Sequence, residues 1–137
     1  MFRFSLINRN IGIDLGTSNS LVYLDKRGIV INEPTIVAVN TKTGRILEVG
    51  ENAKKMLGRT PMHINVIRPL VNGVISDFEM SQEILRRFLR KLAGQSSFTS
   101  FRKAVVGVTS NLTEVERKSV EDAVMGAGVF QPYIIDE

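Results

Sequence analysis

The spacing of the apolar residues changes halfway along the chain, and this change limits the folds that the chain can adopt. In the first half, short apolar runs are separated by turn residues, which is typical of strands. From Ser81 onward, Ile84, Leu85, Phe88 and Leu89 recur at helical spacing, with arginines on the opposite side. We therefore expect a strand-rich first half followed by helices that pack on a sheet.

The strands of the first half are short. Residues 11–15 and 21–24 flank a polar turn, which predicts a hairpin. Glu33-Pro34 separates the next two strands, because proline does not fit an unbroken ladder. The strands expected after the hairpin lie at 29–32, 36–39 and 45–49, followed by a short helix at 51–58 and an irregular stretch containing Pro61 and Pro69.

The second half alternates helix and strand. After the helix from Ser81, we expect a polar loop at 94–102 and a buried strand at 104–108. The sequence Thr113-Glu-Val-Glu116 is a capping box that opens a second helix, to about Gly126, before a last strand at 133–135. A strand–helix–strand unit implies parallel pairing through a right-handed connection. The predicted fold class is a mixed α/β sheet with flanking helices.

Composition excludes several kinds of site. The chain of 137 residues has no cysteine and one histidine, so it cannot form disulfides or a Cys/His zinc site. No apolar run reaches the ~18 residues of a membrane-spanning helix, and Asn8-Arg9-Asn10 interrupts the apolar start too early for a signal peptide. We therefore expect a cytoplasmic protein. The net charge of +4 is compatible with an anionic partner, but nothing indicates nucleic-acid binding.

The most informative motif lies in the first hairpin. Asp14 ends an apolar run, and the turn Gly16-Thr17-Ser18-Asn19 follows. Backbone N–H groups of such a turn can bind phosphate oxygens while the acid organises a hydrated Mg²⁺. The alternative is a hairpin turn chosen only for flexibility and side-chain hydrogen bonds.

The last residues, Asp136 and Glu137, also follow a strand. Ligands of open α/β sheets bind at the carboxyl ends of strands, where a carboxylate can position a water. The alternative is a solvated chain end.

Phenylalanines in polar surroundings suggest contact with a membrane. Phe98 and Phe101 lie in the polar segment that ends in Arg102-Lys103, which suits an apolar wedge below cationic anchors. The alternative is that one or both rings fold back onto the core. Phe2 and Phe4 near the N-terminus are weaker candidates, because they lack a clean apolar stripe.

Five stretches of the sequence together carry a resemblance to a known family: residues 11–19, 28–34, 49–61, 67–78 and 113–117. In these stretches the chain resembles the N-terminal part of the MreB family, bacterial actin homologues that determine rod shape. The sequence departs from the usual family pattern at Ser18, Ser20 and Thr109.

The resemblance implies part of an actin-like, ribonuclease-H-like ATPase fold. Residues 1–32 and 75–137 would form subdomain IA, and residues 33–74 the small inserted subdomain IB. The family's second phosphate loop, adenosine loop and subdomains IIA and IIB have no counterpart in the chain, so we expect it to supply one wall of the nucleotide cleft. These 137 residues alone are not expected to turn over ATP.

The resemblance also implies roles for particular residues. The cofactors would be ATP and Mg²⁺, with Asp14 holding Mg²⁺ through water, Gly16 to Asn19 contacting the phosphates, and Glu137 positioning the attacking water. Phe98 and Phe101 fall where some members carry a membrane-inserting loop.

The family implies self-association into filaments at the inner face of the cytoplasmic membrane. There its members organise cell-wall elongation with MreC, MreD, RodZ and wall synthases. Two alternatives remain open: a truncated, non-catalytic module that binds the membrane or full-length filaments, and another ATPase of the superfamily, such as a chaperone-like protein.

Overall fold

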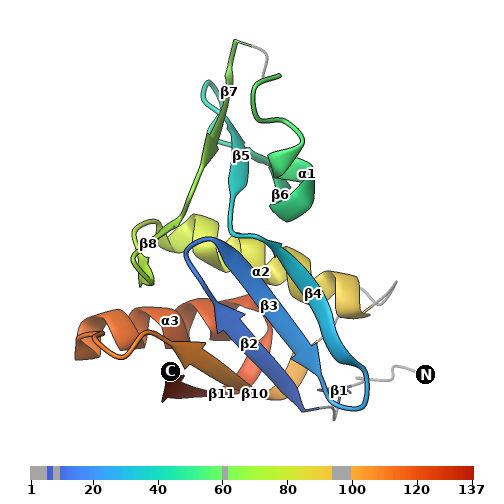
Figure 1. The fold of residues 1–137 in the computed structure, drawn as a ribbon, viewed down its shortest axis with the longest axis vertical. Coiled ribbons are helices and arrows are strands. Elements are labelled where there is room, and N and C mark those ends of the chain that lie inside the picture. The colour runs from blue at the N-terminus through green and yellow to red at the C-terminus, as the bar shows by residue number, and fades with distance from the viewer. Residues whose placement is uncertain (1–5, 8–9, 60–61, 94–99) are drawn as a thin grey trace.

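The computed structural model describes residues 6–7, 10–59, 62–93 and 100–137. Within these ranges the chain forms a six-stranded main sheet, a three-stranded small sheet and three helices. Figure 1 shows the small sheet standing at one end of the main sheet, with α2 and α3 on one face of the main sheet. None of the helices in the described part is both long enough and apolar enough to cross a bilayer.

The main sheet contains antiparallel and parallel pairs, as the sequence predicts. Strands β2 (Ile11–Leu15), β3 (Asn19–Leu24) and β4 (Gly28–Pro34) form an antiparallel meander. Strand β10 (Ser100–Val108) runs parallel to β2 on one side and to β11 (Val129–Asp136) on the other, and its first residues pair with β1 (Leu6–Ile7). The parallel order places the carboxyl ends of β2, β10 and β11 at one edge.

Both long helices begin at capped termini. Helix α3 (Glu114–Ala127) is capped by Thr113, whose hydroxyl accepts a hydrogen bond from the Glu116 N–H at 3.1 Å, as the capping box predicts. Helix α2 (Phe78–Ala93) begins earlier than predicted, because the Asp77 carboxylate accepts a hydrogen bond from the Met80 N–H at 3.1 Å.

Helices α2 and α3 cover the main sheet with an apolar face. The side chains of α2 that the spacing places on one side are buried in one hydrophobic core with residues of β2, β3, β4 and β10. Each fully buried side chain of this size stabilises the fold by about 1.5–3 kcal/mol. The α2 members of this core are Ile84, Leu85, Phe88 and Leu89.

The small sheet lies between the two halves of the main sheet in sequence. Its strands are β5 (Val37–Asn40), β6 (Ile46–Val49) and β7 (Ile64–Ile67), with β5 in the middle, and helix α1 (Gly50–Lys54) packs beside it. Val37 and Val39 of β5 join the main hydrophobic core, whereas Ala38 joins a second cluster with Ile36 and Ala53. The predicted subdomain boundaries near residues 33 and 75 stay predictions.

The stretch predicted to be irregular contains three strands. Strand β7 pairs antiparallel with β5, and strands β8 (Leu70–Val71) and β9 (Val74–Ile75) form a two-residue hairpin. Asn72 and Gly73 both have positive φ angles, 52° and 79°, as a type I′ turn requires. The prediction was wrong here because it weighed the prolines and not the Asn-Gly pair. The predicted break at Pro34 also lies later, since β4 runs through that residue.

Candidate functional site

The turn between β2 and β3 is tightly closed. A Cβ atom on Gly16 would lie 2.5 Å from the backbone oxygen of Asn19, so only glycine fits this position without moving the main chain. Ser18 and Asn19 are exposed, whereas Thr17 is half-buried. The turn therefore lies exposed at the carboxyl end of β2, the edge where ligands of α/β sheets bind.

The β8–β9 hairpin supports the turn from one side. The Gly73 N–H donates a hydrogen bond to the Thr17 hydroxyl at 2.7 Å, and the Arg68 guanidinium contacts the Thr17 carbonyl at 3.5 Å. A Cβ on Gly73 would lie 2.8 Å from a side-chain carbon of Thr109, just after β10. The hairpin tip is thus packed between the turn and the end of β10. Sequence reasoning missed Gly73, although the Asn-Gly pair was a usable signal.

The chain leaving β4 supports the turn from the other side. The Thr35 N–H donates to the Ser18 carbonyl at 2.9 Å, and the hydroxyls of Thr35 and Ser20 lie 2.7 Å apart. The Asn19 amide also donates to the Asn32 carbonyl oxygen at 3.2 Å. Of the predicted phosphate-binding residues, Thr17 and Asn19 therefore engage the fold with their side chains.

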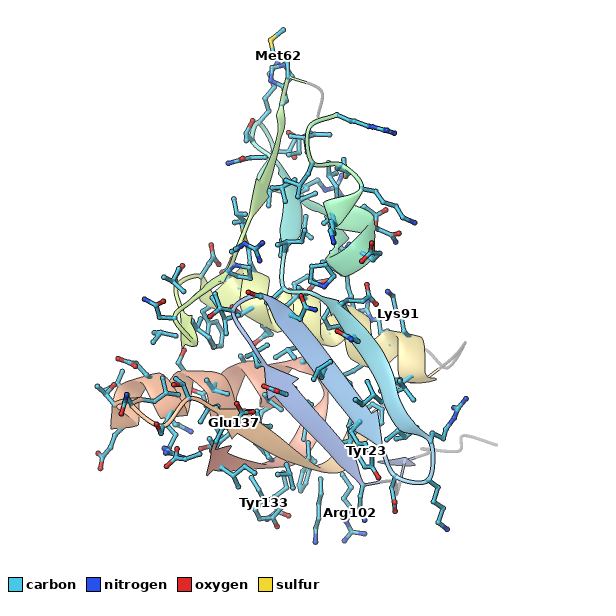
Figure 2. The ribbon with its side chains drawn as sticks, viewed as in Figure 1. Tyr23, Met62, Lys91, Arg102, Tyr133 and Glu137 are labelled. Carbon is cyan, nitrogen blue, oxygen red and sulfur yellow. The ribbon has the colours of Figure 1, made fainter. Side chains whose placement is uncertain are left out.

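Two carboxylates meet beside this turn. Asp14 on β2 is in register with Gly107 on β10. Glu137 follows β11, its N–H donates to the Val108 carbonyl at 2.9 Å, and its carboxyl group lies over Gly107. A Cβ on Gly107 would lie 2.6 Å from Glu137 Oε1, so the absence of a side chain gives Glu137 its place. Figure 2 shows Glu137 close to β2 and far from Met62 at the tip of the small sheet.

Asp14 affects the ionisation of Glu137. A hydrogen bond to Asp14 raises the pKa of Glu137, with smaller contributions from burial and from the negative charge of Asp14. Neither carboxylate forms an ion pair with a lysine or arginine in the described ranges. The neighbouring Asp136, by contrast, pairs with Arg117 of α3. The structure thus brings together Asp14 and Glu137, which the sequence placed on separate strands.

The donor set fits a hydrated cation better than a directly bound one. Among the described residues, no group of three or more histidine or acidic side chains is placed to hold a metal ion. Asp14 and Glu137 instead provide two carboxyl groups beside the turn. Such an arrangement fits Mg²⁺ that keeps most of its waters and is held mainly by phosphate oxygens.

The structure contradicts one membrane prediction. Phe101 lies in β10 and is 1% exposed, packed in the main hydrophobic core, so its ring is not a surface wedge. The alternative of a ring folded back onto the core is correct for this residue, because the strand begins at Ser100 rather than after Arg102. Phe98, Phe2 and Phe4 lie outside the described residues.

Three basic residues of α2 contact other parts of the protein. Arg87 donates to the carbonyls of Ile46 and Leu47 on β6, at 3.1 and 3.2 Å, and Arg86 donates to the Gly126 carbonyl at 3.1 Å. Lys91, visible beside β4 in Figure 2, pairs with Glu33 at 2.8 Å.

Comparisons with known sequences agree with the resemblance described above. The model of the family described as MreB/Mbl protein matches residues 8–137. Cell shape-determining protein Mbl of Bacillus subtilis (strain 168) is 43% identical over 94% of this chain and 38% of its own length. Cell shape-determining protein MreB of Escherichia coli (strain K12) is 36% identical over 96% of this chain and 39% of its own. The chain thus spans about two fifths of the length of these relatives.

Solved structures show the same fold. The crystal structure of MreB5 of Spiroplasma citri bound to ADP superposes with a TM-score of 0.81 at 31% identity, over 95% of this chain and 38% of that one. A MamK double helical filament gives a TM-score of 0.77 at 21% identity, over 94% of this chain and 41% of that one. The fold is therefore actin-like, with a mixed sheet and flanking helices, as the sequence predicts.

Proposed function

This chain belongs to the MreB/Mbl family, and from that premise we propose that it is the nucleotide-binding part of an actin-like ATPase that determines cell shape. The single observation that carries the proposal is the meeting of Asp14, Glu137 and the turn at 16–19 at one edge of the main sheet. The curated relatives are cell shape-determining proteins, and MreB5 of Spiroplasma citri binds ADP and AMPPNP. Both findings support this assignment.

The turn and Asp14 would hold the nucleotide phosphates. Backbone N–H groups of residues 16–19 donate to phosphate oxygens without a competing side chain at Gly16. Asp14 accepts hydrogen bonds from waters around Mg²⁺. When bound, Mg²⁺ neutralises phosphate charge and makes the phosphorus easier to attack.

Glu137 is suited to orient the attacking water. Its carboxyl group lies beside Asp14 rather than in an ion pair, so it can accept a hydrogen bond from water. A raised pKa makes the carboxylate a stronger base than an ordinary glutamate once it is ionised. Phosphoryl transfer needs the phosphates held from both sides, so we expect residues 1–137 alone to bind ATP weakly and to have no useful turnover.

Filament formation and membrane attachment complete the proposal. The protein self-associates into filaments at the inner face of the cytoplasmic membrane and organises cell-wall elongation with MreC, MreD, RodZ and wall synthases. Support comes from the family alone. Since Phe101 is buried, attachment would rely on Phe98, Phe2 and Phe4. Co-sedimentation with anionic vesicles tests this: binding that survives Phe98→Ser combined with Phe2→Ser and Phe4→Ser contradicts it.

Paired variants test the catalytic roles in the protein expressed from its complete reading frame. Glu137→Gln should keep nucleotide affinity and lose most of the steady-state ATPase rate, whereas Asp14→Ala should weaken Mg²⁺-dependent nucleotide binding. Asp136→Asn is the matched control, because it neutralises the adjacent carboxylate that pairs with Arg117. Equal activity of Glu137→Gln and the control would show that Glu137 has no catalytic part. A wild-type protein that binds no nucleotide would favour a non-catalytic module instead.

A further inference from the structure

Two buried hydroxyl groups join the phosphate turn to the chain that leads into the small sheet. Ser20, at the start of β3, and Thr35, just after β4, are both 0% exposed. Their hydroxyl oxygens lie 2.7 Å apart, and either group can be the donor. Within the described residues these two hydroxyls form no other hydrogen bond. Each buried hydroxyl therefore has the other as its hydrogen-bond partner.

Thr35 also contacts the turn through its backbone. Its N–H donates to the Ser18 carbonyl at 2.9 Å, so Thr35 holds residues on both sides of Asn19. Asn19 is exposed in the turn that the proposed function assigns to phosphate binding. Thr35 therefore contacts both neighbours of Asn19, the backbone of Ser18 and the side chain of Ser20, without lying in the turn itself.

Thr35 is also the point at which the chain leaves the main sheet. The next residues, Ile36 and Val37, are buried, and Val37 begins β5, the central strand of the small sheet. A shift of the turn toward a bound phosphate would pull on Thr35 through these two hydrogen bonds. Because the following residues are tightly packed, that shift passes to β5 rather than being absorbed by a loose connection.

We propose that Ser20 and Thr35 are positioning residues that shape the phosphate turn and pass its nucleotide state to the small sheet. The inference rests on the proposed function and deepens it, since it concerns the same nucleotide site. A purely structural role for the pair predicts an effect on stability alone. The positioning role predicts a change in nucleotide affinity and in the nucleotide-dependent hydrogen exchange of β5. These changes should not parallel the change in the unfolding midpoint.

A set of hydroxyl variants separates the two roles. Ser20→Ala and Thr35→Val each leave one buried hydroxyl without a partner, so both should lower the unfolding midpoint. The double variant removes both hydroxyls and should recover most of that midpoint. Thr35→Ser keeps the hydroxyl and serves as the conservative rescue. Ser81→Ala is the matched control, because it removes the hydroxyl of another serine that is 0% exposed and does not contact the turn.

The measurements are the Kd for ADP and AMPPNP with Mg²⁺ and the hydrogen exchange of residues 37–40 with and without nucleotide, in the protein from its complete reading frame. We expect the double variant to bind nucleotide about three- to tenfold more weakly than wild type, which corresponds to the net free energy of one hydrogen bond. We also expect it to lose the nucleotide-dependent change in hydrogen exchange. Thr35→Ser and Ser81→Ala should keep both.

Two results overturn the inference in distinguishable ways. A double variant with wild-type affinity and a wild-type exchange response shows that the pair is structural only and leaves the proposed function intact. A wild-type protein that binds neither nucleotide contradicts the proposed function, and the inference falls with it.

Discussion

Gly107→Ala should impair the proposed catalytic site without destabilising the fold. The new Cβ would lie 2.6 Å from Glu137 Oε1, 3.3 Å from Cγ and 3.4 Å from Cδ. All three nearest atoms belong to one flexible side chain, so Glu137 moves and the strands do not. Because ordinary contacts to a Cβ begin near 3.4 Å, the carboxyl oxygen must move by about 0.8 Å, away from its position beside Asp14.

The expected loss of activity follows from this displacement. A misplacement of about 1 Å in a reacting group costs about 10²-fold in rate, so we expect the ATPase kcat to fall about 10- to 100-fold. This corresponds to about 1.4–2.7 kcal/mol of transition-state stabilisation. The free energy of unfolding should stay the same or rise by up to about 1 kcal/mol, because alanine loses less chain entropy than glycine in a strand.

Gly12→Ala is the matched control on the neighbouring strand. Its Cβ would lie 3.6 Å from Tyr23 Cβ, an ordinary contact, and no atom of Glu137 lies within 4 Å. The assays are steady-state phosphate release and urea unfolding of both variants, made in the protein expressed from its complete reading frame. Wild-type turnover in Gly107→Ala, or a loss of several kcal/mol in its stability, would refute the reasoning.

Three further outcomes are expected. Gly16→Ala places a Cβ 2.5 Å from the Asn19 backbone oxygen, so it should destabilise the fold by about 1–3 kcal/mol and weaken ADP binding in calorimetry; retained affinity contradicts the turn's role. Because the pKa of Glu137 is raised above 4.5 in the folded state, its contribution to stability is present below pH 4.5 and is lost as the pH rises through the raised value. Urea unfolding across pH 3.5–7 should therefore show a smaller fall in stability with rising pH for Glu137→Gln, and equal slopes count against the hydrogen bond to Asp14. Phe101→Ser should cost about 3–5 kcal/mol of stability and leave vesicle binding of the folded protein unchanged. Unchanged stability with lost vesicle binding would show instead that Phe101 inserts into the membrane.

Local signals predicted the elements whose cause is local. The apolar spacing of α2, the cap at Thr113 and the hairpin around Gly16–Asn19 each depend on neighbouring residues, and all three are present. Strand β7 was missed because four residues between prolines become a strand only by pairing with β5, more than twenty positions away. The same reason applies to Phe101, which has polar neighbours in sequence and apolar neighbours in space.

The candidate site was likewise predicted only where the signal lies in consecutive residues. Asp14 and the glycine-rich turn carry their signal in consecutive residues, so they were predicted from the sequence. Glu137 was placed at the carboxyl end of a strand, but its position beside Asp14 depends on the register of three strands. Gly107 and Thr35 carry no signal of their own in the sequence. Gly107 matters because Glu137 lies over it in the folded chain, and Thr35 matters because its hydroxyl contacts that of Ser20.

Strand β5 ties the thermodynamics of the two sheets together. Val37 and Val39 complete the core beneath the main sheet, while Ala38 points to the cluster around Ala53. Unfolding of the small sheet alone would therefore leave a cavity in the main core. For this reason the small sheet and the main sheet should unfold together. Heating should accordingly give one calorimetric transition, with equal calorimetric and van't Hoff enthalpies, and no partly melted state in which the small sheet alone is lost.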